Sequence, residues 1–188
     1  MEKTVYVFLA DGFEEVEALA PVDIMRRAGL NVLTVAMGED LTVYGAHDVT
    51  VVADTLFSLN DFDDASALVL PGGMPGAANL MAHEDLCTLL TKKAVEEDVV
   101  LAAICAAPLV LGELGILKGH KATCYPSFEE HLLGADVDGQ SLVVRSGDDL
   151  ITACGPAAAF ELGFALVTRL KDSATAEAIR QGMMFGRA

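Results

Sequence analysis

Short, continuously apolar segments alternate with longer helix-like segments along the sequence, and this alternation is the feature that most constrains the fold. Strands that are apolar on both faces and separated by helices indicate a parallel sheet covered on both sides. The strands are expected at residues 3–10, 31–37, 67–70, 99–104, 121–124, 141–145 and 150–153. The helices are expected at residues 14–28, 84–97, 106–114 and 156–170, and a small hairpin at residues 41–44 and 49–53. We predict an α/β protein, a three-layer α/β/α sandwich with a doubly wound, mostly parallel sheet, as a single domain over residues 1–188.

The amino-acid composition and the net charge indicate which kinds of binding partner to expect. Of the 188 residues, 53% are hydrophobic, which is enough for a sizeable core, and 12 basic against 28 acidic residues give a net charge of −16. A field of this sign repels phosphate backbones and anionic lipids, so we expect no binding to nucleic acid or to membranes. The longest apolar stretch, residues 99–112, is too short to span a bilayer, and the N-terminus lacks the pattern of a signal peptide. A cytoplasmic protein is expected.

The sequence offers no motif for a metal or a cofactor. Its four cysteines are far apart, without a CxxC pair or a Cys/His cluster, so we expect free thiols and no zinc site. The segment GGMPG at residues 72–76 does not match the GxGxxG fingerprint of dinucleotide-binding proteins, and the chain has no phosphate-binding P-loop motif. We therefore expect an activity that needs neither a metal nor a cofactor.

Cys105 lies where the expected strand at residues 99–104 turns into a helix. Functional residues of doubly wound sheets gather outside the carboxyl ends of the strands. A nucleophile on such a sharp turn needs small neighbours, and Ala103 and Ala107 flank Cys105 as the glycines flank the serine of a G-x-S-x-G turn. The first amides of the next helix would then favour the thiolate. The alternative is a small buried cysteine that packs as a hydrophobic residue.

Two further features are expected to face the same site. Gly72 and Gly73 end a buried strand, where paired glycines let backbone N–H groups approach a developing negative charge, although an ordinary turn remains the alternative. At about 100° per residue, Glu17 projects from its helix near Ile24 and Ala28, on the apolar face. Burial there would raise its pKa and keep the acid protonated near neutral pH. The alternative is a solvated acid in the first turn of a helix.

Four segments carry a resemblance to a known family: DGFEEVEALAPVDIMRRAGL (residues 11–30), LVLPGGMPGAANL (68–80), AAICAAPLVLGELGIL (102–117) and ITACGPAAAFELG (151–163). They closely resemble the ThiJ/PfpI superfamily, in particular the branch that contains Parkinson disease protein 7. The resemblance implies a flavodoxin-like fold and a homodimer. It also implies that Cys105 is the reactive thiol, that Glu17 is its protonated partner, and that Gly72, Gly73 and Ala106 donate backbone N–H groups.

The sequence departs from the superfamily at two positions. Related peptidases place a histidine directly after the cysteine, where this chain has Ala106. Other members of the branch place a histidine where this chain has Tyr125, whose phenol, with an ordinary pKa near 10, cannot replace an imidazole at neutral pH. Peptide hydrolysis through a Cys–His pair is therefore not expected.

Several other residues are expected around the same strand ends. The candidates for a pocket beside the reactive thiol are Cys124, Tyr125, Cys154, Gly155, Pro156 and His47. By the family resemblance, His47 would reach the site of the partner chain in the dimer. Cys124 or Cys154 would form a disulfide with an oxidised Cys105, or both would be buried spectators.

Three functions stay open at this point. Members of the family are described as cofactor-free glyoxalases or protein deglycases, and as oxidative-stress sensors or chaperones. The first hypothesis is an enzyme of the former kind, acting on methylglyoxal, another small carbonyl compound, or glycated side chains. The second is a redox sensor or chaperone-like protein in which Cys105 is oxidised without turnover, and the third is a member with a decayed site. An older label in the family, thiazole monophosphate biosynthesis, has no support in these residues.

Overall fold

The computed structural model describes residues 3–187, so residues 1–2 and 188 of the expected domain lie outside the described part. Seven strands form the central sheet in the order β10-β11-β7-β6-β1-β2-β5. Strand β10 runs antiparallel to β11, and the other neighbouring strands of this sheet pair in parallel. Their bounds are β1 (Thr4–Leu9), β2 (Asn31–Ala36), β5 (Thr55–Leu56), β6 (Ala65–Leu70), β7 (Val100–Ile104), β10 (Val143–Ser146) and β11 (Leu150–Ala153).

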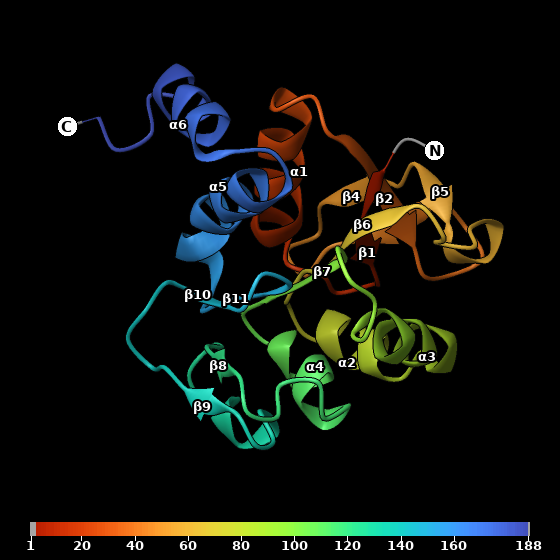
Figure 1. Cartoon of the computed structure of the whole chain (residues 1–188). Helices are drawn as coiled ribbons and strands as arrows, with labels where there is room; N and C mark the ends of the chain where they lie inside the picture. Colours follow the sequence, from red (N-terminus) through yellow and green to blue (C-terminus); the bar gives the residue numbers. More distant parts are fainter. Residues whose placement is uncertain (1–2, 188) are drawn as a thin grey trace.

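Helices cover both faces of this sheet (Figure 1). One layer holds α1 (Glu15–Arg27), α5 (Ala159–Leu170) and α6 (Ser173–Gly182), in which α5 packs against both of the others. The other layer holds α2 (Gly76–Met81), α3 (Glu84–Lys93) and α4 (Pro108–Glu113). The predicted three-layer, mostly parallel α/β/α architecture is confirmed. No helix among residues 3–187 combines the length and the apolar composition that crossing a membrane requires.

Alternation along the central strands builds a separate core on each side of the sheet. In β1, Val5 and Val7 belong to the core under α1 and α5, whereas Tyr6 and Phe8 belong to the core on the opposite face. Successive side chains of a strand point to opposite faces, so a strand buried on both sides must be apolar at nearly every position. All six residues of β1 are indeed buried.

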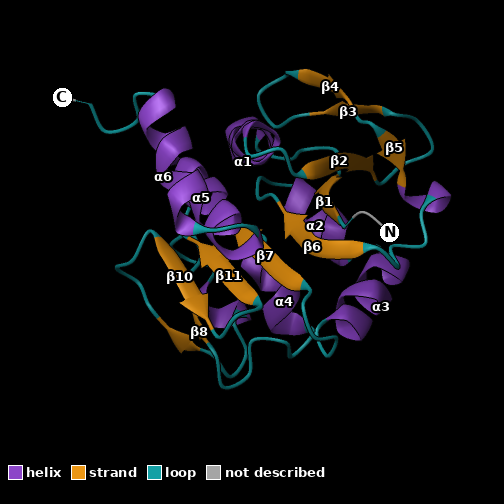
Figure 2. Cartoon of the chain, turned by 45° about the horizontal axis from the view of Figure 1, so that its top comes forward, coloured by secondary structure: helices purple, strands orange, loops and turns teal. Residues whose placement is uncertain are grey.

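The predicted hairpin forms outside the main sheet, as Figure 2 shows. Strands β3 (Thr42–Tyr44) and β4 (Thr50–Val52) pair antiparallel. The loop between them returns to the chain just before α1, where Phe13 and Gly45 form an isolated bridge and the Ala46 N–H donates to the Phe13 carbonyl over 2.8 Å. The hairpin is thereby held beside the first turn of α1.

Some predicted elements were wrong in extent. The expected strand at residues 121–124 shrinks to β8 (Lys121–Ala122), which pairs with β9 (Asp136–Val137) instead of joining the central sheet. On the side away from β9, the backbone N–H of Thr123 donates to the Thr152 hydroxyl in β11 over 2.9 Å rather than to a backbone carbonyl. The expected helix at residues 156–170 begins with a 3₁₀ turn at Pro156–Ala158.

Other boundaries moved, and several further elements were not predicted. The helix expected at residues 84–97 ends at Lys93, where the chain turns and reaches a positive φ of 68° at Asp98. The helix expected from residue 106 begins at Pro108, because the backbone of residues 105–107 forms the turn itself. Strands β5 and β9, helices α2 and α6, and the 3₁₀ turns at Phe57–Leu59 and Glu129–His131 are absent from the prediction.

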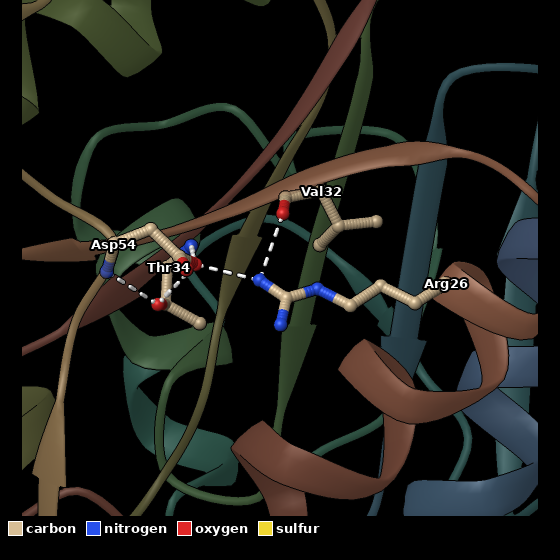
Figure 3. Close-up of polar contacts among 4 residues, drawn as sticks. All are labelled: Arg26, Val32, Thr34 and Asp54. Atoms are coloured by element: carbon tan, nitrogen blue, oxygen red, sulfur yellow. Dashed lines mark hydrogen bonds and ion pairs between the residues drawn. The ribbon is translucent and has the colours of Figure 1, made fainter.

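A polar network fastens the end of α1 to the edge of the sheet (Figure 3). The Asp54 carboxylate accepts hydrogen bonds from Arg26 (2.6 Å) and from both the backbone N–H (2.8 Å) and the hydroxyl (2.6 Å) of Thr34 in β2. Arg26 also donates to the carbonyl of Val32 over 2.9 Å. Because these bonds join α1, β2 and the segment before β5, they fix the helix that carries Glu17.

Candidate active site

Cys105 occupies a sharp turn between β7 and α4. Its φ of 64° lies in the left-handed region, which costs a non-glycine residue about 1–3 kcal/mol and persists only where the surroundings enforce it. Hydrogen bonds supply that enforcement: the Cys105 N–H donates to the carbonyl of Ala153 over 2.9 Å, and its own carbonyl accepts from Tyr125 N–H over 2.8 Å. The residue as a whole is half-buried.

Glu17 reaches the same place from α1. As its helical position predicted, it lies on the apolar face, and its exposed fraction is 0%. Burial, helped by the charge of Glu14, raises the pKa of Glu17 from its ordinary 4.5 to about 7. The backbone N–H of Gly72 donates to Oε2 of the carboxyl over 3.0 Å. The carboxyl is therefore held in one position and titrates near neutral pH.

The Cys105 and Glu17 side chains lie close together, since a Cβ at Gly72 would come within 2.6 Å of both, and Oε1 of Glu17 has no hydrogen-bond partner among the described residues. Burial raises the pKa of Cys105 to about 12, and the ionised Glu17 carboxylate contributes to that rise. The nearby N–H groups of Ala106 and Gly73 lower the pKa of the thiol, but they do not outweigh burial. The predicted resting thiolate is thus not supported, because the two amides compensate only part of the desolvation of the anion.

The Cys105 thiol and the Glu17 carboxyl form a pair that carries two protons at low pH and loses one of them near pH 7. Near pH 7 the pair loses a proton from the carboxyl side, and the thiol then faces a carboxylate that can accept its proton. A carboxylate whose pKa lies near the working pH is well suited to act as a general base. The arrangement can therefore generate a sulfur nucleophile at the moment of attack.

Gly72 has a different task from the predicted one. Its N–H is engaged by Glu17 and so is not a free donor for the charge of a substrate. A Cβ at this position would lie 2.5 Å from Oε2 of Glu17 and 2.6 Å from Cβ of Cys105, so only glycine lets the two side chains meet. The N–H groups of Gly73 and Ala106 lower the pKa of the Cys105 sulfur, and their role as donors to a developing oxyanion stays a prediction.

The predicted pocket residues fall into two groups. Cys124 and Cys154 line one cavity of about 120 Å³ together with Glu129, and burial raises the pKa of Cys124 to about 11. Tyr125 is 46% exposed, and its ring lies over Gly155, where an added Cβ would come within 3.1 Å of the ring. The strand ends that carry Cys105, Tyr125 and Cys154 therefore meet, as the sequence predicted.

Pro156 and His47 are not brought to the reactive sulfur by the contacts of residues 3–187. Pro156 is exposed at the start of its 3₁₀ turn. His47 contacts two acids of its own chain, with Nδ1 at 2.9 Å from Glu15 Oε2 and 3.3 Å from Glu14 Oε2. Its reach into the site of a partner chain stays a prediction.

Two glycines that were not predicted as site residues bring the loops of the site together. A Cβ at Gly12 would lie 2.5 Å from Cδ of Pro75, and one at Gly76 would lie 2.6 Å from the nitrogen of Phe13. The turn after β1 therefore packs directly on the segment after β6. The recurrence of glycine at both strand ends is the sequence signal for this close packing, whereas the prediction used the glycines only as a source of N–H donors.

An α/β sandwich with a cysteine on a strained strand-to-helix turn, beside a buried carboxyl from the first helix, defines a reactive-cysteine class of protein. The family model described as DJ-1/PfpI matches residues 3–169. The chain therefore belongs to the DJ-1/PfpI family, which confirms the predicted resemblance.

Known members show how close the similarity is. Toxoplasma gondii DJ-1 in an oxidized form has a structure with a TM-score of 0.91 at 31% identity, covering 98% of this chain and 99% of that chain. A Pyrococcus abyssi protein named as a deglycase is 32% identical over 134 residues, 71% of this chain and 79% of the relative. Arabidopsis thaliana protein DJ-1 homolog B is 37% identical over 166 residues, 88% of this chain and 37% of that longer protein.

Proposed function

We propose that the protein is a cofactor-independent enzyme of the glyoxalase or deglycase type, in which Cys105 attacks methylglyoxal, related α-oxoaldehydes or their early adducts on side chains. The observation that carries the proposal is the placement of the Cys105 side chain directly beside the buried Glu17 carboxyl, with the Glu17 pKa raised to about 7. The similarity to a relative named as a deglycase supports the same class of substrate.

The reaction follows from the groups present. Ionised Glu17 takes the thiol proton as the Cys105 sulfur bonds to the aldehyde carbon, and the proton passes to the new oxyanion to give a hemithioacetal. Glu17 then moves a proton from the former aldehyde carbon to the neighbouring carbon through an enediol, which leaves a thioester. Water hydrolyses the thioester and releases lactate and the free thiol. In sum, methylglyoxal and one water give lactate, with no net oxidation.

The backbone amides near the Cys105 sulfur stabilise negative charge on that atom. The N–H groups of Ala106 and Gly73 favour the anionic form of the sulfur, so they would stabilise the thiolate that leaves the thioester. The described contacts put no histidine beside Cys105, so this route uses a carboxylate where a Cys–His peptidase uses an imidazole. Peptide hydrolysis is not part of the proposal.

Lactate formation from methylglyoxal tests the proposal. Cys105→Ser should abolish it, and Glu17→Gln should lower it strongly while keeping the size of the side chain. Cys87→Ser, at a half-buried cysteine that bonds to the Met81 carbonyl, is the matched control and should retain activity. Equal rates in wild type and Cys105→Ser would reject the enzymatic assignment.

A second candidate is a redox sensor or chaperone-like stress protein that stops after oxidation of Cys105. The Toxoplasma gondii relative has a structure in an oxidized form. Two amides and a carboxyl that can donate a proton would also stabilise the oxygens of a sulfinate. Mass spectrometry after mild peroxide should then find two added oxygens on Cys105 before Cys87, and the reverse order would contradict this candidate.

The setting of the enzyme is part of the same proposal. A reducing compartment such as the cytoplasm would keep the four cysteines as thiols. A homodimer would cover the apolar side chains of Val16 and Leu19, each 37% exposed on α1. Light scattering at micromolar concentration tests the dimer, and a monomer mass would contradict it.

A further inference from the structure

Three metal-ligating side chains gather at a place where none of them is a proposed catalytic group. Glu14 and Glu15 stand at the start of α1, and His47 lies in the loop between β3 and β4. One ligand atom from each residue lies within 4.8 Å of the others. The closest pairs join Nδ1 of His47 to Oε2 of Glu15 (2.9 Å) and to Oε2 of Glu14 (3.3 Å).

The backbone holds these ligands in place. The N–H of His47 donates to Oε1 of Glu15 over 2.7 Å, so Oε1 is fixed while Oε2 faces the imidazole. Gly45 makes this possible, because a Cβ there would collide with the carboxylate of Glu15. The bridge between Phe13 and Gly45 joins the loop to the helix start directly. A loop and a helix terminus thus present their ligands from a rigid base.

The donor set has the chemistry and the spacing of a transition-metal site. One imidazole nitrogen and two carboxylate oxygens suit zinc and its neighbours in the first transition row better than calcium or magnesium, which prefer oxygen alone. Ligand atoms about 2.1 Å from a tetrahedral zinc ion are about 3.4 Å apart, close to the two distances from Nδ1. The net charge of −16 attracts cations to the surface.

We propose that Glu14, Glu15 and His47 bind a divalent transition-metal ion of the zinc class, with water completing its coordination. No metal was expected from the sequence motifs, and the site does not depend on the proposed enzymatic activity. The ion takes the position of the proton that His47 shares with the two carboxylates. It cross-links the β3–β4 hairpin to α1 and stabilises the folded chain.

An ordinary histidine–glutamate ion pair elsewhere in the chain provides a matched comparison. Nδ1 of His131 lies 2.8 Å from Oε1 of Glu113, a contact as close as that of His47 with Glu15. Within residues 3–187, no third metal-ligating side chain joins this pair. His131→Ala therefore removes one imidazole and one ion pair without removing the proposed site.

Zinc titration by calorimetry, with cobalt absorption spectroscopy, tests the proposal in full-length protein carrying Cys105→Ser, so that the reactive thiol cannot bind the ion. We expect one zinc per chain and a cobalt spectrum without a sulfur charge-transfer band. His47→Ala and Glu14→Gln should each weaken zinc binding by more than about tenfold. Removing a residue that only supports a metal ligand already lowers the affinity by about tenfold, so removing a ligand itself should lower it further. His131→Ala should bind zinc like the parent.

Two results would overturn the site. The first is that the Cys105→Ser parent binds no zinc when zinc and protein are both at micromolar concentration. The other is equal affinity of His47→Ala and His131→Ala, which would show that the zinc sits elsewhere. Circular dichroism of each variant checks the fold, and because the side chain of His47 is 69% exposed, its removal should leave the fold intact.

Discussion

Replacing Glu17 by glutamine should change how the stability of the protein depends on pH. Glutamine keeps the size of the side chain and an oxygen that accepts the Gly72 N–H, but it cannot ionise. The folded wild type binds the Glu17 proton more tightly than the unfolded chain, because burial raises the pKa from 4.5 to about 7. As pH rises through this window, the unfolded chain releases the proton first, so the free energy of unfolding falls and then levels off above about pH 7.

The size of the effect follows from that difference in pKa. At about 1.4 kcal/mol per pKa unit, a rise from 4.5 to about 7 corresponds to about 3 kcal/mol. If the free energies of unfolding of the two proteins are set equal near pH 4.5, that of Glu17→Gln should be higher than that of wild type by about 3 kcal/mol at pH 8. The sign does not depend on which member of the Cys105–Glu17 pair carries the charge above pH 7, since one proton leaves the pair either way.

Urea unfolding followed by circular dichroism at pH values from 4.5 to 8 measures this difference. Titrations of other groups are common to both proteins and cancel when the two free energies are subtracted. Glu130→Gln, at an exposed glutamate, controls for the loss of one carboxylate. If the Glu17→Gln and wild-type curves stay parallel within about 0.5 kcal/mol, Glu17 does not hold a proton to neutral pH and the proposed general base is wrong.

Three further predictions test the site and its support. Gly72→Ala should destabilise the protein by about 1–3 kcal/mol and abolish lactate formation, because its Cβ would come within 2.5 Å of the Glu17 carboxyl. Gly139→Ala is the control, because its Cβ would meet no atom within 4 Å, and it should change neither stability nor activity. Equal effects of the two substitutions would contradict the prediction. In wild type, kcat/KM for methylglyoxal should rise through about pH 7 as Glu17 ionises, whereas a fall over that range would make the protonated acid the active form. Asp54→Ala should cost about 1–3 kcal/mol in urea unfolding because it removes the carboxylate that the backbone N–H of Thr34 bonds to in β2. Asp23→Ala, which breaks an exposed ion pair on α1, should cost no more than about 0.5 kcal/mol, and a similar loss in both would show that the network is not special.

Local pattern was enough for the architecture and for the placement of Glu17 and Cys105. Buried strands must be apolar on both faces, so the alternation of segments predicted the parallel sheet and its two helical layers. Helical periodicity alone placed Glu17 on the buried face, and small neighbours predicted the sharp turn at Cys105, which has a φ of 64°. These properties depend on residues within a few positions of one another.

What the sequence could not decide depends on contacts between distant segments. The Gly72 N–H is engaged by a carboxyl 55 positions earlier, and the carboxylate of Glu15 is covered by a loop 32 positions later. The balance between burial and two amides at the sulfur exists only once three strand ends meet, and it reverses the expected pKa of Cys105. Periodicity in the chain determines which face each residue takes, whereas desolvation depends on everything that packs around it, and that is decided only by the tertiary structure.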